Sequence, residues 1–195
     1  MKKILTFILC LAIPLTIGGI SGFATVTGIE SWYSALNKPF FNPPNWIFAP
    51  VWTTLYALMG LGLFLIWQSP KSIERTNAIA IFAIQIALNF VWSFLFFYFE
   101  NPGFALIEIL FLWIAIFMMI LYFRKINKVA GNIQIPYLLW VSFATCLNAA
   151  IWWLINFFVI FIVGKSHFII QIVLIVDLTL NINSVPTISQ EDLLI

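Results

Sequence analysis

The chain has 195 residues, of which 63% are hydrophobic and only 8% are charged. A soluble domain carries about 25% charged residues, so this chain has too few to cover a surface that faces water. The formal net charge of +2 is too small for a surface that follows nucleic-acid phosphates, and so hydrophobic a chain is not intrinsically disordered. The composition predicts an integral membrane protein that meets the lipid bilayer and no nucleic acid.

The first apolar segment follows Met1-Lys2-Lys3. Basic residues before an apolar run are also typical of a secretory signal peptide. Here the run continues past Ile20 to about Thr27, and no convincing cleavage site of small residues follows a short core. We therefore expect this segment to be the first transmembrane helix.

Five apolar stretches are long enough to span a bilayer, which takes roughly 20 helical residues. They lie at about residues 4–27, 46–67, 78–99, 104–123 and 135–163. The breaks between them contain proline, glycine and charged residues, and the short break at 100–103 predicts a tight turn between antiparallel helices. The sequence thus predicts an all-α integral membrane protein, with a five-transmembrane-helix bundle over residues 1–163.

Residues 164–195 form an atypical C-terminal extension. Its apolar stretch at 168–180 is interrupted by Gln171 and Asp177 and is too short to span a bilayer alone. We expect an interfacial helix or a loose appendage in preference to a sixth crossing.

The distribution of Lys and Arg predicts the orientation. In a chain with five spans, the N-terminus lies on the same side as the second and fourth connections. That side holds Lys2, Lys3, Lys71, Arg75, Arg124, Lys125 and Lys128, whereas the other side holds Lys38 and Lys165. Because basic residues favour the cytoplasmic side, we expect a cytoplasmic N-terminus. The Lys-Lys start and the lack of an organellar targeting segment point to a bacterial inner membrane.

The predicted outer connection, residues 28–45, is rich in proline and aromatic residues. Pro39, Pro43 and Pro44 fix φ and forbid a regular helix. A stiff aromatic loop over one mouth of the bundle would serve equally well as a lid or as a rigid connector. Pro50 lies further on and is expected to kink the second helix.

Ionisable groups inside a bilayer are functional candidates. Only Glu108 lies within a predicted span, and its closeness to the break at 100–103 favours snorkelling to the interface. The sequence offers no buried lysine for a Schiff base and no carboxylate–histidine relay. The single histidine, His167, excludes a bis-histidine haem or a zinc site built from histidines. We expect no catalytic residue, no metal site and no resident cofactor.

Three spans each place aromatic and polar or small residues on one helical face. These stripes are Gln85, Asn89, Trp92 and Phe96; Trp140, Ala144 and Asn148; and Trp52, Tyr56 and Gly60. The amides should face the bundle interior, where hydrogen bonding between helices would also explain them; the tryptophans could instead mark the membrane interface. Together the stripes describe an apolar pocket with a few hydrogen-bonding groups, which suits a flat, largely hydrophobic molecule.

Small residues four positions apart favour close helix packing at two places. Gly18-x-x-x-Gly22 is common in membrane helices and carries no specific functional signal. Ala83-x-x-x-Ala87 could pack within the bundle or against a second subunit, so a homodimer is a candidate assembly.

A run of tryptophans, prolines and asparagines carries a family resemblance. The segments are Trp32-Tyr33, Lys38-Pro39, Pro43-Pro44-x-Trp46, Pro50-Val51-Trp52-x-x-Leu55-Tyr56-x-x-Met59-Gly60, Ala87-Leu88-Asn89-x-x-Trp92, Phe96-Phe97 and Pro136-Tyr137-x-x-Trp140-x-x-Phe143-Ala144-Thr145-x-Leu147-Asn148. Between about residues 29 and 156 the chain resembles the TspO/translocator protein family, the tryptophan-rich sensory proteins and peripheral benzodiazepine receptors.

The resemblance implies a five-helix bundle, often dimeric, that binds porphyrins, sterols and isoquinoline-type ligands in an internal pocket. The family's pocket residues fall on Trp52, Asn89, Trp92, Trp140, Ala144 and Leu147, with Tyr33 from the loop. Tyr56, Glu108 and Asn148 are supporting candidates, and Glu108 stands where family members often carry an acidic residue.

Two departures from the family pattern bear on ligands. Phe41 lies where the family often has tryptophan before its Pro-Pro pair, which weakens an expected lid contact. The sterol motif of animal members is broken at Ala149 and Trp153. Cholesterol transport is therefore not inferred.

Three functional hypotheses follow. The first is a membrane sensor, regulator or carrier that binds tetrapyrroles, with Trp and Tyr rings stacked on the macrocycle. The second is an enzyme that degrades porphyrin under light, with Trp52 and Trp140 as redox-active aromatics; no acid–base residues support it, so a binding protein is preferred. The third is a helical interaction partner without a ligand, whose pocket tryptophans could be replaced without loss of function.

Overall fold

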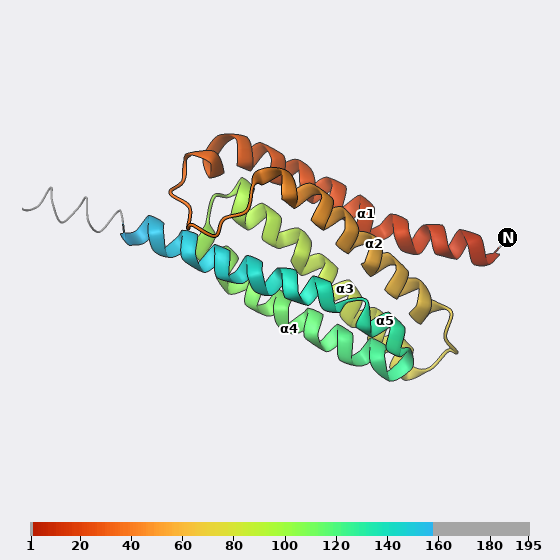
Figure 1. Cartoon of the computed structure of the whole chain (residues 1–195). Helices are drawn as coiled ribbons and strands as arrows, with labels where there is room; N and C mark the ends of the chain where they lie inside the picture. The colour runs from red at the N-terminus through yellow and green to blue at the C-terminus, as the bar shows by residue number, and fades with distance from the viewer. Residues whose placement is uncertain (1, 158–195) are drawn as a thin grey trace, which may run out of the picture. The chain divides into compact units, whose positions relative to one another are not determined.

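The computed structural model describes residues 2–157, which are predominantly helical (Figure 1). The helices are α1 (Lys2–Gly28), α2 (Phe48–Trp67), α3 (Ile73–Ser93), α4 (Pro102–Ile126) and the short α5 (Lys128–Asn132), which a turn joins to helix 135–157. Two π-helical segments, η1 (Ile29–Tyr33) and η3 (Phe94–Tyr98), extend α1 and α3, and the 3₁₀ turn η2 (Asn45–Ile47) leads into α2. No strand occurs within residues 2–157, so the predicted all-α class is confirmed.

Within residues 2–157, five segments are long and apolar enough to cross a membrane, as predicted. They are Lys2–Gly28, Asn45–Trp67, Ile73–Tyr98, Pro102–Ile126 and Lys128–Phe157. The chain divides into two compact units, residues 1–154 and 155–195; of the second, only a helical turn at 155–157 is described. The predicted end of the last span at residue 163 and the extension 164–195 lie outside the described residues.

The first unit is a bundle in which consecutive long helices run antiparallel (Figure 1). Within it, α1 packs against α2 and α3 packs against α4, while η3 and α3 also pack on α1. The N-terminus, the connection 68–72 and the α4–α5 junction lie at one end, which we call the basic end. The connection 34–44 and the turn 99–101 lie at the other, which we call the loop end.

Side-chain caps explain where α3 and α4 begin. Ser72 accepts a hydrogen bond from the backbone N–H of Arg75 at the start of α3. Asn101 caps α4 in the same way and is followed by Pro102, whose missing N–H costs nothing at this position. Glu100 takes a left-handed φ of 51°, which completes the tight turn expected between α3 and α4.

The expectation that Pro50 kinks α2 is wrong. The helix begins at Phe48, so Pro50 lies in its first turn. The first backbone N–H groups of a helix have no intrahelical acceptor, so a proline here breaks no hydrogen bond. Pro50 helps to start α2 and gives no cause for a bend within it.

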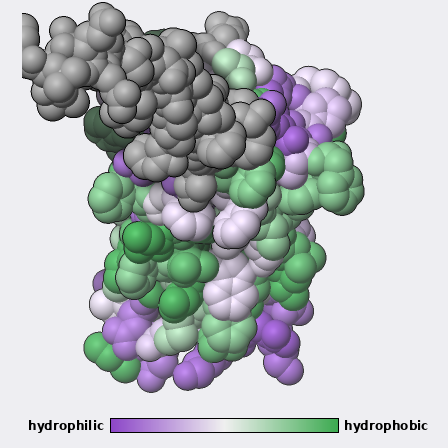
Figure 2. Space-filling view, turned by 90° about the vertical axis from the view of Figure 1, so that its left-hand side faces the viewer, coloured by the Kyte–Doolittle hydropathy of each residue, from purple (hydrophilic) through white to green (hydrophobic). Residues whose placement is uncertain are grey.

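Most of the outer surface is apolar. Figure 2 shows hydrophobic and weakly polar residues across the middle of one face, with hydrophilic residues gathered toward its edges. Ala83 and Ala87 are exposed on α3, so they do not pack within the described bundle.

Candidate functional site

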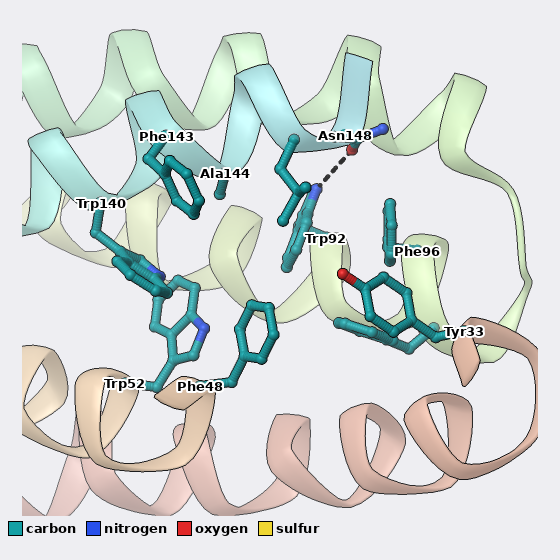
Figure 3. A pocket seen from close by; sticks show the side chains of 11 residues that line it. Tyr33, Phe48, Trp52, Trp92, Phe96, Trp140, Phe143, Ala144 and Asn148 are labelled. Atoms are coloured by element: carbon teal, nitrogen blue, oxygen red, sulfur yellow. Dashed lines mark hydrogen bonds between the residues drawn. The ribbon is translucent and has the colours of Figure 1, made fainter. Parts of the chain in front are cut away.

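An aromatic pocket lies inside the bundle toward the loop end (Figure 3). Eleven residues from η1, α2, α3, η3 and helix 135–157 line it: Tyr33, Phe48, Trp52, Trp92, Phe96, Phe97, Trp140, Phe143, Ala144, Leu147 and Asn148. We call this set the aromatic pocket. Helical spacing accounts for its walls, because Phe48 and Trp52 are four residues apart, as are Trp140 and Ala144.

The rings of the pocket contact one another closely. Trp92 stacks on Phe96 with ring centroids 5.3 Å apart, and Trp140 meets Phe48 edge-to-face at 6.1 Å. The cavity between the rings has a volume of only about 20 Å³. That is room for little more than one water, so a flat macrocycle would have to move some of the rings apart.

Two polar contacts fix one wall of the pocket. The indole N–H of Trp92 donates to Asn148 Oδ1 at 3.2 Å, and Asn148 Nδ2 donates to the carbonyl of Pro102 at 2.7 Å. The indole N–H of Trp92 and the side-chain amide of Asn148 thus both have hydrogen-bond partners within the protein. Within the described part of the chain, the indole N–H groups of Trp52 and Trp140 donate no hydrogen bond to another residue.

Asn89 does not line the aromatic pocket. It is buried next to it, where it accepts a hydrogen bond from the Tyr56 hydroxyl at 2.6 Å and donates to the Tyr137 hydroxyl at 3.2 Å. Tyr137 in turn donates to Gln85 Oε1 at 3.0 Å. This phenol–amide network joins α2, α3 and helix 135–157, which is the interhelical role considered for the amides.

The network supports the pocket through Trp52. The Trp52 ring stacks on Tyr56 at 5.6 Å and meets the edge of Tyr137 at 6.2 Å. Both phenol hydroxyls are held by Asn89. Asn89 therefore positions the two rings against which Trp52 packs.

Tyr33 lies on η1, the extension of α1, and not in a free loop as expected. Its side chain is buried, and its hydroxyl donates to Asn42 Oδ1 at 2.5 Å. The Lys38 ammonium lies 5.0 Å from the centre of its ring, and burial raises the pKa of Tyr33 to about 12. These contacts fasten the connection 34–44 to the wall of the aromatic pocket.

Glu108 does not snorkel, contrary to expectation. It is 9% exposed and lies on the buried face of α4 with Ala105, Ile109 and Leu112. Neither carboxyl oxygen has a hydrogen-bond partner among the described residues. The expectation failed because distance along the chain to the turn at 100–103 does not reveal which face of α4 the side chain occupies. Glu108 does not line the aromatic pocket.

Six of the seven predicted ligand-binding residues line the pocket together: Tyr33, Trp52, Trp92, Trp140, Ala144 and Leu147. The supporting candidate Asn148 joins them, whereas Tyr56 stands behind Trp52. Phe48, Phe97 and Phe143 were not predicted as lining residues, and Asn42 was not predicted as the partner of Tyr33. Helical spacing from Trp52 and Trp140 could have identified Phe48 and Phe143, but no local signal marks Asn42.

The fold and the pocket define a class: five-helix membrane proteins with an aromatic cavity inside the bundle. The family model described as the TspO/MBR family matches residues 10–154. The chain belongs to the TspO/MBR family. The expected resemblance is thereby confirmed.

Named relatives come from archaea, bacteria and animals. The chain is 40% identical over 150 residues to "Tryptophan-rich protein TspO" of Archaeoglobus fulgidus, covering 77% of this chain and 97% of that protein. It is 36% identical over 138 residues to "Translocator protein" of Ovis aries, covering 69% of this chain and 82% of that protein. It is 34% identical over 144 residues to "Tryptophan-rich sensory protein" of Cereibacter sphaeroides, covering 74% of this chain and 85% of that protein.

Proposed function

We propose that this protein binds a flat, largely hydrophobic tetrapyrrole, such as protoporphyrin, in the aromatic pocket and acts as a membrane sensor, regulator or carrier. The observation that carries this proposal is the pairing of stacked aromatic walls with the unpaired indole N–H groups of Trp52 and Trp140. Aromatic faces suit a macrocycle, and two donors suit the polar atoms at its edge. Names such as "Tryptophan-rich sensory protein" among the relatives agree with a sensory role.

The pocket has to open for such a ligand. The connection 34–44 covers the loop end and is held there by the contact between Tyr33 and Asn42. Release of this contact would let the connection and the rings of Phe48 and Phe96, which pack on Tyr33, move apart. In this proposal the connection 34–44 acts as a lid.

Membrane placement and assembly are part of the same proposal. The seven Lys and Arg residues of the basic end favour a cytoplasmic N-terminus, in a bacterial inner membrane. The exposed pair Ala83 and Ala87 supports a homodimer built on α3.

The test is a titration of the purified full-length protein in detergent with protoporphyrin in the dark, followed by tryptophan fluorescence. We expect saturable quenching in the wild type and, in Trp140→Phe, a dissociation constant roughly 2- to 10-fold higher, because phenylalanine lacks the indole N–H and one hydrogen bond is worth about 0.5–1.5 kcal/mol. Trp67→Phe is the matched control, since Trp67 lies at the basic end of α2, far along the helix from the pocket. Absence of saturable quenching in the wild type would refute the tetrapyrrole pocket.

A second function, light-dependent porphyrin degradation, is favoured by one observation. Trp52 and Trp140 border the same cavity, where a bound porphyrin would touch both indoles. Of the eleven lining residues only Tyr33 carries a titratable side chain, so this chemistry would depend on the ligand's own photochemistry. Loss of porphyrin absorbance under light that Trp140→Phe abolishes, and Trp67→Phe does not, would support the enzyme; stable absorbance would support the binding protein.

A further inference from the structure

An open hollow lies on the outer face of α4 near the basic end. It has a volume of about 360 Å³ and is lined by Met118, Leu121, Tyr122, Arg124 and Lys125. The steps of three and four residues between Met118, Leu121 and Lys125 place these side chains on one face of the helix. Leu121, Arg124 and Lys125 are exposed, so the hollow opens to the outside of the bundle. We call it the α4 hollow.

The α4 hollow changes from charged to apolar along the helix. The 25 residues of α4 extend about 37 Å at 1.5 Å per residue, which is longer than the hydrocarbon core of about 30 Å. The last turn, which carries Arg124 and Lys125, therefore extends into the headgroup region. Met118 lies about 9 Å deeper along the helix than Arg124. A phospholipid has the same order, with a phosphate at the surface and acyl chains below it.

Neighbouring residues hold the two cations at the rim of the α4 hollow. A Cβ atom on the buried Gly131 of α5 would clash with Cγ of Arg124, so the backbone of α5 packs directly on the stem of this arginine. The Lys125 ammonium lies 5.5 Å from the centre of the Tyr122 ring, in a cation–π contact. Both charges are thus positioned by the fold while their N–H groups stay exposed.

No carboxylate in the described chain neutralises these two cations. Among residues 2–157, the side chains of Arg124 and Lys125 form no ion pair. Of the acidic residues in that range, only Glu74 belongs to this end, where its carboxylate interacts with Ser72 in the cap of α3. Basic residues in a last turn also offset the negative end of the helix dipole, but that role requires no apolar hollow beside them.

We propose that the α4 hollow binds one anionic phospholipid, whose phosphate meets Arg124 and Lys125 and whose acyl chain packs on Met118 and Leu121. A guanidinium presents paired N–H donors that match the oxygens of a phosphate. The two unpaired cations select a headgroup with net negative charge, since a zwitterionic headgroup adds a cation of its own. Basic pockets at the cytoplasmic ends of membrane helices bind such headgroups. The proposal does not depend on a tetrapyrrole being bound.

The first test removes the charges. The full-length protein is purified with equal amounts of a phosphatidylglycerol and a phosphatidylcholine that have the same acyl chains, and retained lipids are counted by native mass spectrometry. We expect the wild type to retain one phosphatidylglycerol per chain in preference to phosphatidylcholine. Arg124→Gln/Lys125→Gln should hold it about 5- to 30-fold more weakly, because each basic residue near the membrane surface contributes about 5-fold.

A matched variant separates this site from the general charge of the basic end. Lys2→Gln/Lys3→Gln removes the same two charges from exposed positions of α1 at that end and should retain the phosphatidylglycerol as the wild type does. Equal weakening by the two double variants would overturn the proposal, because charge alone would then explain retention. Equal retention of both lipids by the wild type would also overturn it.

The second test fills the apolar part of the hollow and separates a lipid from free phosphate. We expect Met118→Trp to reduce retention of phosphatidylglycerol as far as Arg124→Gln/Lys125→Gln does. Ile114→Trp adds a similar bulk one turn deeper, at a position of α4 that is 54% exposed and outside the lining, and should retain the lipid. An excess of glycerophosphoglycerol, the headgroup without acyl chains, should not displace it. Full retention in Met118→Trp, or displacement by the headgroup alone, would overturn the proposal.

Discussion

Asn89 links three helices through two phenol hydroxyls, and the stability that this link contributes depends on its burial. The amide accepts from Tyr56 and donates to Tyr137 where no water competes. Satisfied polar groups in such surroundings are stabilising, but each one left without a partner costs about 1–3 kcal/mol. The amide thus contributes to the stability of the bundle and to the position of Trp52.

Replacement of Asn89 by leucine should therefore destabilise the protein. We expect Asn89→Leu to lower the free energy of unfolding by about 2–4 kcal/mol, because the Tyr56 hydroxyl loses its acceptor and Tyr137 loses a donor. Thermal unfolding in detergent measures this change. Asn77→Leu, an exposed asparagine of the same helix, is the control and should unfold like the wild type. Equal stability of the two variants would show that the network contributes little.

The hydroxyl of Tyr33 holds the connection 34–44. We expect Tyr33→Phe to keep the ring contacts with Phe48 and Phe96 but to lose the bond to Asn42, a loss of about 1 kcal/mol. Chymotrypsin should then cleave faster after Phe40, which is 100% exposed in this connection. Tyr98→Phe, at an exposed tyrosine outside the connection, should leave the cleavage rate unchanged.

The same contact should be insensitive to pH near neutrality. Burial raises the pKa of Tyr33 from 10.0 to about 12, so the donating hydroxyl contributes its full stabilisation below pH 10 and loses it as the pH rises through about 12. The ratio of the cleavage rates of Tyr33→Phe and wild type should stay constant from about pH 6 to about pH 9, because the activity of the protease itself changes equally for both. A ratio that falls to one within this range would contradict the assignment of the tether to this hydroxyl.

At the scale of single residues, helical spacing could predict much of the aromatic pocket. The four-residue steps of Trp52–Tyr56 and Trp140–Ala144 each define one face of a helix, and the structure places those faces toward the interior. Spacing could not predict that Asn89 is taken by Tyr56 and Tyr137, because those partners lie 33 and 48 residues away in the chain. Only the packing of the helices decides whether such an amide faces a cavity or another side chain.

At the scale of helices, glycine decides how closely α1 approaches its neighbours. A Cβ atom on Gly60 of α2 would lie 2.8 Å from the carbonyl oxygen of Cys10, and one on Gly28 would lie 2.5 Å from that of Phe97. Both obstacles are backbone atoms, which cannot move aside alone. Sequence patterns identify small residues in a span but do not tell which of them face a partner and which face open space.

A pair of glycine substitutions tests this distinction. We expect Gly60→Ala to lower the free energy of unfolding by about 1–3 kcal/mol, because α1 must move away from α2. Gly22→Ala, which meets nothing within 4 Å, should be neutral or stabilising, since alanine is the better helix former. Thermal unfolding of both variants is the measurement, and equal melting temperatures would contradict the close approach at Gly60.

For the whole molecule, the length of the apolar segments was the feature that best predicted the fold. All five spans follow from the roughly 20 residues that a bilayer requires, and the helices extend beyond the predicted bounds by only a few residues at most ends. The start of the connection predicted at 28–45 was harder to predict, because helix η1 continues α1 as far as Tyr33, upstream of the prolines. Pro39, Pro43 and Pro44 exclude a regular helix where they stand, but they do not show where the preceding helix ends.

Cysteine labelling can test the proposed orientation of the bundle. In a background with Cys10→Ala and Cys146→Ala, we expect Lys38→Cys to react with a membrane-impermeant maleimide in intact cells. Lys71→Cys should react only after the membrane is permeabilised, because the basic end should face the cytoplasm. Labelling of Lys71→Cys alone in intact cells would mean that the opposite orientation is correct.

The dense aromatic packing of the pocket has a kinetic consequence. Because little more than one water fits between the rings, the proposed macrocycle would enter only those molecules whose rings have already separated. Its measured affinity would then be the intrinsic affinity multiplied by the fraction of such molecules. At high ligand concentration the association rate should level off at the rate of ring separation, so the protein itself would set the pace at which it responds to its ligand.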